Sequence, residues 1–400
     1  MSELTIEVSL LEKIIRKFTE EATARVTAVN YKNVGEKGDN YTSEVKRIFI
    51  NYITQGNAGD LEKEVSLFLK HMHNQNEQAK ILLQGVFEHE TKIMMGPLED
   101  MSPMLTVARV PRLLYSHQDD PTFAIMEDLG PLGFIMHSRA TGLDLAHALL
   151  AMRGLAEFHG SSVLVYEKTP DYKKTLSLNM FENPNNGAFN FFNTSFHSLA
   201  DTIAEWEELG PKYAEKLRNL TTGILEKMEK VYKSRENEFT VLNHGDCTQL
   251  NLLFAYDENK KPIKIALVDF QIATYNNPVV DLRSLISSST TQEVFQHHQH
   301  TLLREYHSVL SETMKTLHCK TPTPSLEDIE KMYDDRAFIS VLSTCASYPI
   351  IHAAPSNVVS LDDMLFDNTN RRRGQYEQKD FKDLLITRLL DFDKSGLLDQ

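Results

Sequence analysis

The chain has 400 residues, of which 41% are hydrophobic and 24% charged, a composition typical of a globular protein large enough for two lobes. Its formal net charge of −14 argues against a nucleic-acid partner, because phosphate backbones select basic surfaces. The three cysteines have no paired spacing, the first residues lack a signal peptide, and no run of about 18 apolar residues predicts a membrane helix. We therefore expect a cytoplasmic protein that binds neither nucleic acid nor membrane, and no feature specifies an oligomeric state.

The first part of the chain combines helices with a predicted five-stranded sheet. Apolar residues at helical spacing predict helices over 10–24 and 78–95. Alternating apolar and polar positions, bounded by glycine-containing loops near 35–38 and 56–59, predict strands. The strands cover residues 25–31, 44–52, 64–70, 111–115 and 123–126.

The rest of the chain is predicted to be mostly helical, with a buried strand over 263–268. The helices cover residues 143–162, 193–204, 212–234, 282–289, 293–317, 325–346 and 380–390. Loop signals lie at 183–187 and 321–324. The basic tract at 371–373 is interpreted as a solvated loop, with a docking patch as the alternative.

A His-Gly-Asp sequence at 244–246 is followed by Asn251 and, behind an apolar run, by Asp269-Phe-Gln. Phosphoryl transfer needs one carboxylate beside the acceptor hydroxyl and others that hold the metal on the phosphates. Protein kinases use a catalytic-loop Asp, an Asn five positions later and an Asp-Phe-Gly Asp, and Asp246, Asn251 and Asp269 keep that order and spacing. The alternative is a polar loop and hairpin whose acidic residues lie at turns.

The chain resembles the ecdysteroid kinase-like family, also called CHK kinase-like, of the aminoglycoside phosphotransferase and choline kinase superfamily. The resemblance rests on HGDCTQLN, DFQ and six further segments between Gly35 and Leu282. These are GEKGDNYTS (35–43), LFLK (67–70), FEHE (87–90), AIMEDL (124–129), LAEFH (155–159) and PVVDL (278–282). The resemblance implies an α+β, two-lobed protein-kinase-like fold. A nucleotide-binding lobe would cover 1–126 and a mainly helical lobe 127–400.

The same resemblance implies ATP and Mg²⁺ as cofactors of a small-molecule kinase. Asp246 would accept the proton of the substrate hydroxyl, and Asn251 and Asp269 would hold magnesium. Lys70, at the end of an apolar strand, would neutralise phosphates. Glu90 is the expected partner of Lys70 and Glu88 the second choice, while the alternative for Lys70 is a strand-end lysine that faces water.

Two further segments are expected to contact the nucleotide. Within the turn at 35–43, Gly35 and Gly38 would let backbone N–H groups approach phosphate oxygens; Asn40 and Ser43 belong to the same pattern. Ser43 would donate to a phosphate or cap the turn.

The segment 126–129 lies between the lobes by count. Backbone groups of Glu127 and Leu129 would meet the adenine edge and Met126 would line its pocket. The carboxylates of Glu127 and Asp128 are interpreted as solvated.

Several conspicuous residues are interpreted as structural. His159 is expected in the core, Asp281 is expected to anchor the catalytic loop through hydrogen bonds, and His244 to pack beneath that loop. Cys247 is not expected to be a nucleophile, because nothing nearby would lower its thiol pKa. The histidines at 297–300 lack the partners of a metal site.

The acceptor is expected to be a hydroxylated apolar molecule such as an ecdysteroid or a xenobiotic alcohol. Thr248 departs from the family, which usually has an aromatic residue there. Phenylalanines at 181, 189, 191, 192 and 196, with Asn190 and Asn193, are compatible with a steroid pocket or with ordinary helix core.

Two alternative functions remain open. A choline, ethanolamine or aminoglycoside kinase would need a receptor for a cation, and Glu205, Glu207 and Glu208 around Trp206 are candidates; a solvated helix face explains them equally. A catalytically silent binding protein with the same fold is the second alternative.

Overall fold

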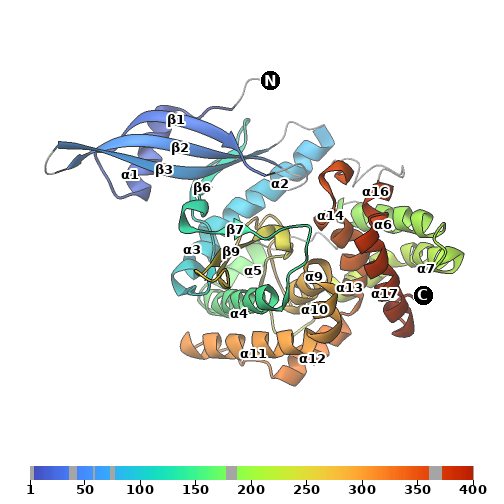
Figure 1. The fold of residues 1–400 in the computed structure, drawn as a ribbon. Coiled ribbons are helices and arrows are strands. Elements are labelled where there is room, and N and C mark those ends of the chain that lie inside the picture. The colour runs from blue at the N-terminus through green and yellow to red at the C-terminus, as the bar shows by residue number, and fades with distance from the viewer. Residues whose placement is uncertain are drawn as a thin grey trace.

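The computed structural model describes residues 4–35, 43–56, 59–72, 77–176, 187–359 and 372–399. It has two lobes, a small one built on an antiparallel sheet and a large one that is mostly helical (Figure 1). The expected α+β, two-lobed kinase-like fold is confirmed.

The small lobe contains the expected five-stranded sheet, with strand order β1-β2-β3-β6-β5 and antiparallel neighbours throughout. The strands are β1 (Arg25–Asn33), β2 (Ser43–Gly56), β3 (Gly59–Met72), β5 (Leu113–His117) and β6 (Phe123–Glu127). Helix α1 (Val8–Phe18) covers one face. It is shorter than the predicted 10–24 because Glu20 adopts a left-handed φ of 60° before β1 begins.

Alternation along β2 and β3 decides which side chains reach the cleft. Ile48 and Leu67 are paired in register and buried in the core under α1. Because successive side chains on a strand point to opposite faces, the neighbouring pairs Val45–Lys70 and Arg47–Phe68 lie on the other face. That face looks toward the large lobe.

Helix α2 (Glu77–Ile93) connects the sheet to the large lobe. The predicted helix reached Met95, but a wider π-helical turn, η1 (Met94–Leu98), begins at Met94. Pro97 lies inside this turn and has no N–H to donate, which is compatible with the change in winding. Short turns α3 (Glu99–Met101) and η2 (Ser102–Met104) follow.

Two small sheets carry the motif residues of the large lobe. One has the order β4-β10-β9-β7 and the other pairs β11 with β8. The strands are β4 (Ala108–Arg109), β7 (Ile135–Met136), β8 (Val241–Asn243), β9 (Leu252–Tyr256), β10 (Pro262–Leu267) and β11 (Thr274–Asn276). The predicted strand 263–268 is confirmed as β10, but Ile263 is 48% exposed, so only its second half is buried.

The remaining helices surround these sheets, with α4 against α11 (Figure 1). Short 3₁₀ turns are η3 (Gly130–Leu132), η4 (Gln249–Asn251) and η6 (Pro355–Asn357), and η5 (Ser343–Ser347) is a π turn. The α-helices are α4 (Leu145–Lys168), α5 (Asp171–Thr175), α6 (Gly187–Ile203), α7 (Gly210–Thr222), α8 (Ile224–Tyr232), α9 (Val279–Ser289), α10 (Gln292–His297), α11 (Gln299–Thr316), α12 (Leu326–Asp335), α13 (Phe338–Leu342), α14 (Tyr348–Ile351), α16 (Arg373–Tyr376) and α17 (Lys379–Lys394).

Three segments predicted as single helices are divided. The breaks lie at Gly223, His298 and Arg336, whose φ angles of −116°, −123° and −114° leave the helical range. Periodicity continued across each break because the residues on both sides pack into one core. The predicted helix 193–204 also begins earlier, at Gly187.

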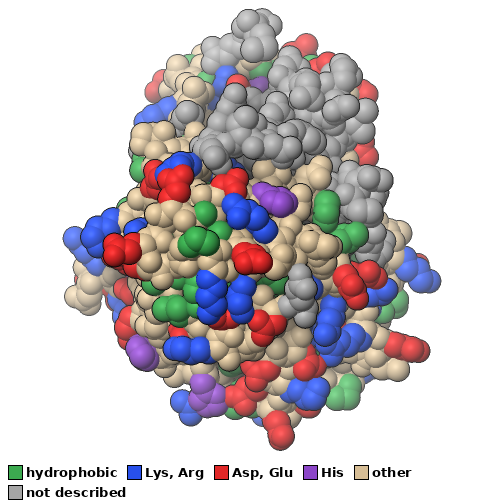
Figure 2. Space-filling model, turned by 90° about the vertical axis from the view of Figure 1, so that its right-hand side faces the viewer, with side chains coloured by type: hydrophobic (Ala, Val, Ile, Leu, Met, Phe, Trp, Pro, Cys, Tyr) green, Lys and Arg blue, Asp and Glu red, His purple; other side chains and the backbone are tan. Residues whose placement is uncertain are grey.

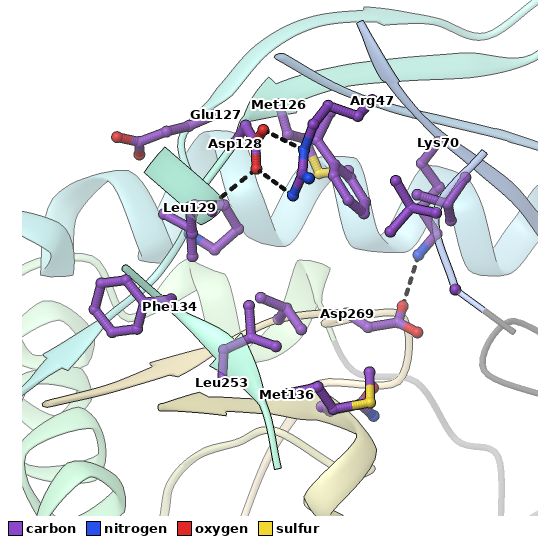
Figure 3. A pocket seen from close by; sticks show the side chains of 18 of the residues that line it. Arg47, Lys70, Met126, Glu127, Asp128, Leu129, Phe134, Met136, Leu253 and Asp269 are labelled. Atoms are coloured by element: carbon purple, nitrogen blue, oxygen red, sulfur yellow. Dashed lines mark hydrogen bonds and ion pairs between the residues drawn. The ribbon is translucent and has the colours of Figure 1, made fainter. Parts of the chain in front are cut away.

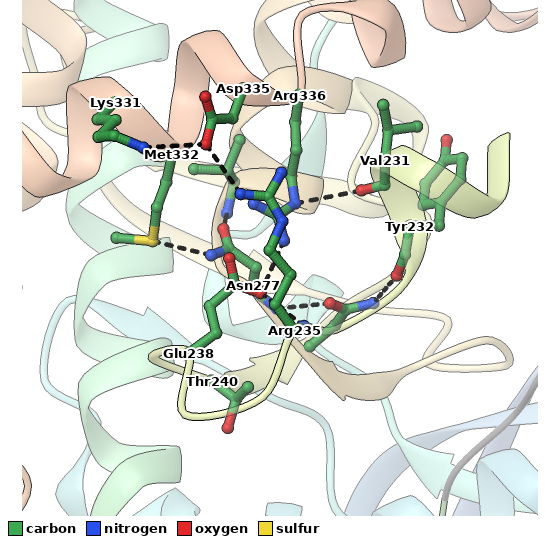
Figure 4. Close-up of polar contacts among 12 residues, drawn as sticks. Val231, Tyr232, Arg235, Glu238, Thr240, Asn277, Lys331, Met332, Asp335 and Arg336 are labelled. Atoms are coloured by element: carbon green, nitrogen blue, oxygen red, sulfur yellow. Dashed lines mark hydrogen bonds and ion pairs between the residues drawn. The ribbon is translucent and has the colours of Figure 1, made fainter. Parts of the chain in front are cut away.

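The break at Arg336 positions a buried cation. Its Nε donates to the Val231 carbonyl at 3.1 Å and its Nη2 lies 2.7 Å from Glu238 (Figure 4). Nearby, Asn276 donates to the Tyr232 carbonyl at 2.5 Å. These contacts fix the end of α8 against α12 and β11. The chain continues from α8 to β8, and the His-Gly-Asp motif follows β8.

The basic tract near the carboxyl end was interpreted as a solvated loop, and this is wrong for Arg372. Arg372 is 1% exposed and donates to the Ala346 carbonyl at 3.2 Å and to Ser195. Arg373 pairs with Glu205 and Glu377, whereas Arg371 lies outside the described residues. The tract therefore holds α16 against α6.

No helix among the described residues is long and apolar enough to cross a bilayer. Figure 2 shows one face of the molecule, on which Lys and Arg side chains are interspersed with Asp and Glu. No large basic patch is visible on the described part of that face.

Candidate active site

A cavity of about 300 Å³ lies between the two lobes (Figure 3). Its small-lobe side includes Val45 and Phe68, from the cleft face of the sheet. The opposite side includes Leu253 and Val268, and the connecting segment 126–130, called the hinge below, closes one end. Predicted site residues Gly35, Lys70, Glu90, Asn251 and Asp269 also line the cavity.

Lys70 lies between two carboxylates. Its Nζ is 2.7 Å from Glu90 Oε2 and 2.6 Å from Asp269 Oδ1. Burial acts to lower the pKa of Lys70, but the charges of Asp269 and Glu90 outweigh it and raise this pKa above its ordinary value. Lys70 is therefore a buried ammonium and not a strand-end lysine facing water.

Glu90, rather than Glu88, is the helix carboxylate that reaches Lys70. Glu90 is buried on α2, and burial raises its pKa to about 7 against the opposing charge of Lys70. Glu88 lies 3.9 Å from Lys92 on the same helix, with 42% of its side chain exposed. The order of preference from sequence agrees with this geometry.

Asp281 holds the loop that carries the His-Gly-Asp motif. Its carboxylate accepts the backbone N–H groups of His244 at 2.6 Å and Gly245 at 2.9 Å, and lies 3.2 Å from His159 Nε2. Gly245 has a φ of 85°, and a Cβ there would lie 2.2 Å from the Ile272 carbonyl oxygen. The loop thus requires glycine at this position, and Asp281 has the anchoring contacts expected from sequence.

His244 and its neighbours complete the underside of the loop. His244 is buried, with Nε2 2.8 Å from the Val268 carbonyl and its ring 4.7 Å from that of Phe270. Burial raises the pKa of the Cys247 thiol well above its ordinary value, which keeps it protonated and unreactive. Thr248 is also buried, so it presents little surface to an acceptor.

Asp246 and Asn251 are in direct contact. Asn251 Nδ2 donates to the Asp246 carbonyl at 2.9 Å and to its Oδ2 at 3.0 Å. The Asn251 carbonyl accepts from Val268 N–H at 3.1 Å, which brings the loop beside Asp269. Burial raises the pKa of Asp246 above its ordinary value, and the charge of Asp269 adds to this effect.

Asp269 follows β10 in a left-handed conformation, with a φ of 67°. A non-glycine residue there is uncommon, and strain of this kind gathers at functional sites. This conformation turns its carboxylate toward Lys70 and the cavity.

Asn251 and Asp269 fit a magnesium ion by the chemistry of their donors. Asn251 commits its amide nitrogen to Asp246, which leaves its amide oxygen for a metal, and Asp269 retains carboxylate oxygen. Magnesium prefers such oxygens and commonly takes only one or two from the protein. No group of three His, Cys, Asp or Glu side chains in the described chain could hold a metal, so phosphate and water oxygens would complete the shell.

Two histidines of the segment 297–300 contact carboxylates of the protein. His298 lies 2.7 Å from Glu293 and His300 2.5 Å from Glu330. These two histidines each lie beside one carboxylate, which is compatible with the structural interpretation.

The hinge carboxylates are not solvated, contrary to the interpretation from sequence. Both are buried. Glu127 turns away from the cavity, with Oε1 2.5 Å from Arg109. Asp128 accepts from Arg47, from Ser66 Oγ at 2.6 Å and from Gly130 N–H at 2.9 Å. Arg47 could have been identified from sequence as a cavity residue. It is a charged residue in an apolar strand and lies two positions after Val45, on the same face of the strand.

The other predicted nucleotide contacts divide into three groups. Met126 and Leu129 line the cavity, as does Gly35, whose φ is 87°. Glu127 also borders the cavity, but its side chain points away from it. Ser43 begins β2 opposite Met72 and is buried without lining the cavity. Gly38 and Asn40 lie outside the described residues.

The phenylalanine run is mainly helix core. Phe192 and Phe196 are buried in the large core, and Phe189 and Phe191 pack against it in part. None of these four lines the cavity between the lobes, and residue 181 is outside the described part of the chain.

The candidate cation receptor around Trp206 is engaged by the protein's own cations. Glu205 pairs with Arg373, and Glu208 lies 3.1 Å from Lys382. The Lys382 ammonium is 5.1 Å from the centre of the Trp206 ring. These contacts disfavour a choline-type receptor at this position.

The chain is similar to an ethanolamine kinase from Plasmodium vivax, at 12% identity and a TM-score of 0.47, over 89% of this chain and 84% of that one. It is also similar to APH(2″)-IIa in its ternary complex with streptomycin and ATP, at 13% identity and a TM-score of 0.35, over 84% and 99%. No curated protein matches. The profile of the ecdysteroid kinase-like family matches residues 37–319, more than two thirds of the chain, and the protein therefore belongs to that family.

Proposed function

We propose that this protein is an ATP-dependent kinase that transfers phosphate to a hydroxyl group of a small apolar molecule. The observation that carries the proposal is the meeting of Lys70, Glu90 and Asp269 at the cavity where Asn251 bridges to Asp246. The nucleotide-binding lobe would cover 1–126 and the catalytic lobe 127–400. The cytoplasmic location stays a prediction from composition.

In this proposal Asp246 is the residue that acts on the acceptor. Its free carboxylate oxygen would receive the hydroxyl proton and orient the hydroxyl oxygen for in-line attack. Asn251 donates to the other oxygen and holds the carboxylate in place. The raised pKa of Asp246 makes it a better proton acceptor than an exposed aspartate would be.

Lys70 would bind the phosphates of ATP, and Glu90 would keep its ammonium oriented. Asn251 and Asp269 would hold magnesium, which neutralises charge on the phosphate oxygens when it is bound. Met126 and the backbone of Glu127 and Leu129 would contact the base, with Gly35 near the phosphates. We also keep Gly38, Asn40 and Ser43 as proposed phosphate-binding residues of the turn at 35–43.

Family membership supports a proposal for the acceptor class. We propose a hydroxylated apolar metabolite such as an ecdysteroid or a xenobiotic alcohol. The choline, ethanolamine or aminoglycoside alternative is weakened because Glu205 and Glu208 already pair with cations. The remaining alternative is a catalytically silent binding protein. The presence of Asp246 for the acceptor and of Asn251 and Asp269 for magnesium argues against it.

The first test is direct. The protein is incubated with ATP, magnesium and a panel of hydroxylated metabolites, and the products are read by mass spectrometry for one added phosphate group. We expect phosphorylation of at least one apolar alcohol. Magnesium-dependent ATP binding without any phosphorylated product across the panel would favour the silent binding protein.

A second test separates the acceptor classes. Ecdysone and 20-hydroxyecdysone should be phosphorylated or should raise the melting temperature, whereas choline and kanamycin should do neither. Phosphorylation of choline without a response to any steroid would change the substrate class and leave the kinase assignment intact.

A further inference from the structure

The cavity between the lobes has two chemically different ends (Figure 3). Lys70 and Asp269 form a charged end that suits phosphates. The other end is formed by the hinge and by apolar side chains such as Phe134 and Leu253, which suit a planar base. The cation Arg47 lies at this second end, joined to the hinge residue Asp128 in the view of Figure 3.

Arg47 is fixed at the hinge by a two-point ion pair. Its Nε lies 2.5 Å from Asp128 Oδ2 and its Nη2 lies 3.1 Å from Asp128 Oδ1. Asp128 is itself held by Ser66 Oγ at 2.6 Å and by the N–H of Gly130 at 2.9 Å. Paired contacts of this kind set the orientation of the planar guanidinium as well as its position.

The guanidinium nevertheless remains open to the cavity. The Asp128 side chain is 2% exposed, but the Arg47 side chain is 32% exposed and lines the cavity. Arg47 is paired in register with Phe68, and both lie on the cleft face of the sheet. Phe68 and Arg47 thus form adjacent parts of the same cavity wall, facing Leu253 from the other lobe.

We propose that Arg47 is a nucleotide-binding residue that stacks its guanidinium on the base, and that Asp128 is a positioning residue acting through it. This inference rests on the proposed function. Guanidinium groups stack on aromatic faces, whereas the ammonium of lysine has no planar face. The Asp128 carboxylate balances the charge, so Arg47 contributes a flat surface more than a net charge.

Gly130 offers a second, independent way to change the position of the Arg47 guanidinium. A Cβ on Gly130 would lie 2.7 Å from Arg47 Nη2, closer than real contacts allow. The backbone of Gly130 is outside the left-handed region, so alanine adds no backbone strain there. Gly130→Ala should therefore displace the tip of Arg47 without removing it.

The test compares two ligands that differ only in the presence of a nucleoside. Binding of ATP and of inorganic tripolyphosphate, each with magnesium, is measured by calorimetry on the full chain. Arg47→Lys keeps the charge and loses the flat face, and Arg47→Met keeps the length and loses both. We expect Arg47→Lys and Arg47→Met to raise the Kd for ATP by about threefold to thirtyfold, the range for a partly desolvated cation–π contact. Neither should change the Kd for tripolyphosphate.

Gly130→Ala should raise the Kd for ATP in the same direction, again without an effect on tripolyphosphate. The matched control is Arg153→Lys, because Arg153 pairs with Glu305 at the surface of α4. The control should bind both ligands as the wild type does.

The outcomes separate this inference from the proposed function. If the wild type binds ATP and Arg47→Lys binds it equally well, stacking by Arg47 is wrong while the nucleotide site stands. A parallel loss of ATP and tripolyphosphate affinity would mean that Arg47 only maintains the fold of the lobe. If the wild type binds neither ligand, the proposed function itself fails.

Discussion

Two pairs of acidic residues in this protein differ in how their carboxylate oxygens are used. Glu157 accepts the backbone N–H groups of Thr106, Val107 and Ala108 and the Thr106 hydroxyl, at 2.5–2.9 Å. Asp281 likewise accepts two backbone N–H groups, those of His244 and Gly245. Asp246 and Asp269, in contrast, each have one strong side-chain donor, Asn251 and Lys70 respectively.

Under the proposed function, this difference separates acids that would build the site from acids that would act in it. A carboxylate whose oxygens are all engaged by backbone donors has nothing left for a ligand, and its loss leaves several buried N–H groups without a partner. A carboxylate with spare oxygen capacity beside a cavity can bind a proton or a metal. Substitutions in the two pairs should therefore affect different measurements.

Asp246→Asn should give the largest effect. The amide cannot accept the hydroxyl proton, so we expect kcat to fall by about 10²–10⁴-fold, the usual contribution of a general base. Affinity for ATP should remain largely intact, because Asp246 acts on the acceptor. Turnover is measured with the substrate identified by the metabolite panel. Near-normal turnover of this variant would remove Asp246 from its assigned role.

Glu157→Gln tests the other pair. The new amide nitrogen would face backbone donors, and we expect the free energy of unfolding to fall by about 2–4 kcal/mol, the cost of unsatisfied buried groups. Glu305→Gln, at a surface ion pair with Arg153, is the control and should cost about 0–1 kcal/mol. Chemical denaturation gives both values. Equal free energies of unfolding for Glu157→Gln and Glu305→Gln would contradict a structural role for the Glu157 carboxylate.

Many of the contacts in the candidate site could be predicted from sequence, because the spacing of the motifs indicates which residues lie close together. The order of Asp246, Asn251 and Asp269 and the alternation that presents Lys70 are local patterns. The hinge carboxylate of Asp128 was misjudged because its partner Arg47, on β2, is far away in sequence. Arg372 was misjudged for the same reason, since its partners lie on α6 and η5.

The pH dependence of activity should sharpen the role of Asp246. Burial raises its folded-state pKa above the ordinary 3.8, so activity should be lost as the pH falls through this raised value, earlier than for an exposed aspartate. The acidic limb of the kcat/KM profile measures it. An acidic limb at the pKa of an exposed carboxyl would contradict a raised pKa for Asp246.

The raised pKa of Asp246 should also have a smaller effect, on the stability of the protein. A raised folded-state pKa stabilises the protein below the unfolded value, and this stabilisation is lost as the pH rises through the folded value. Asp246→Asn should therefore melt at a higher temperature than the wild type at neutral pH, and the difference should shrink toward about pH 4. Thermal unfolding across this range checks the sign. A difference that grows on acidification would contradict it.

The most direct test of the account is magnesium-dependent ATP binding by the wild type and by Asp269→Ala, measured by calorimetry. The account predicts that the wild type binds ATP more tightly with magnesium than without it. The variant should lose this dependence, because the carboxylate that would hold the metal is gone. Equal binding of magnesium-ATP by the two proteins would contradict the central claim and would favour a silent binding protein.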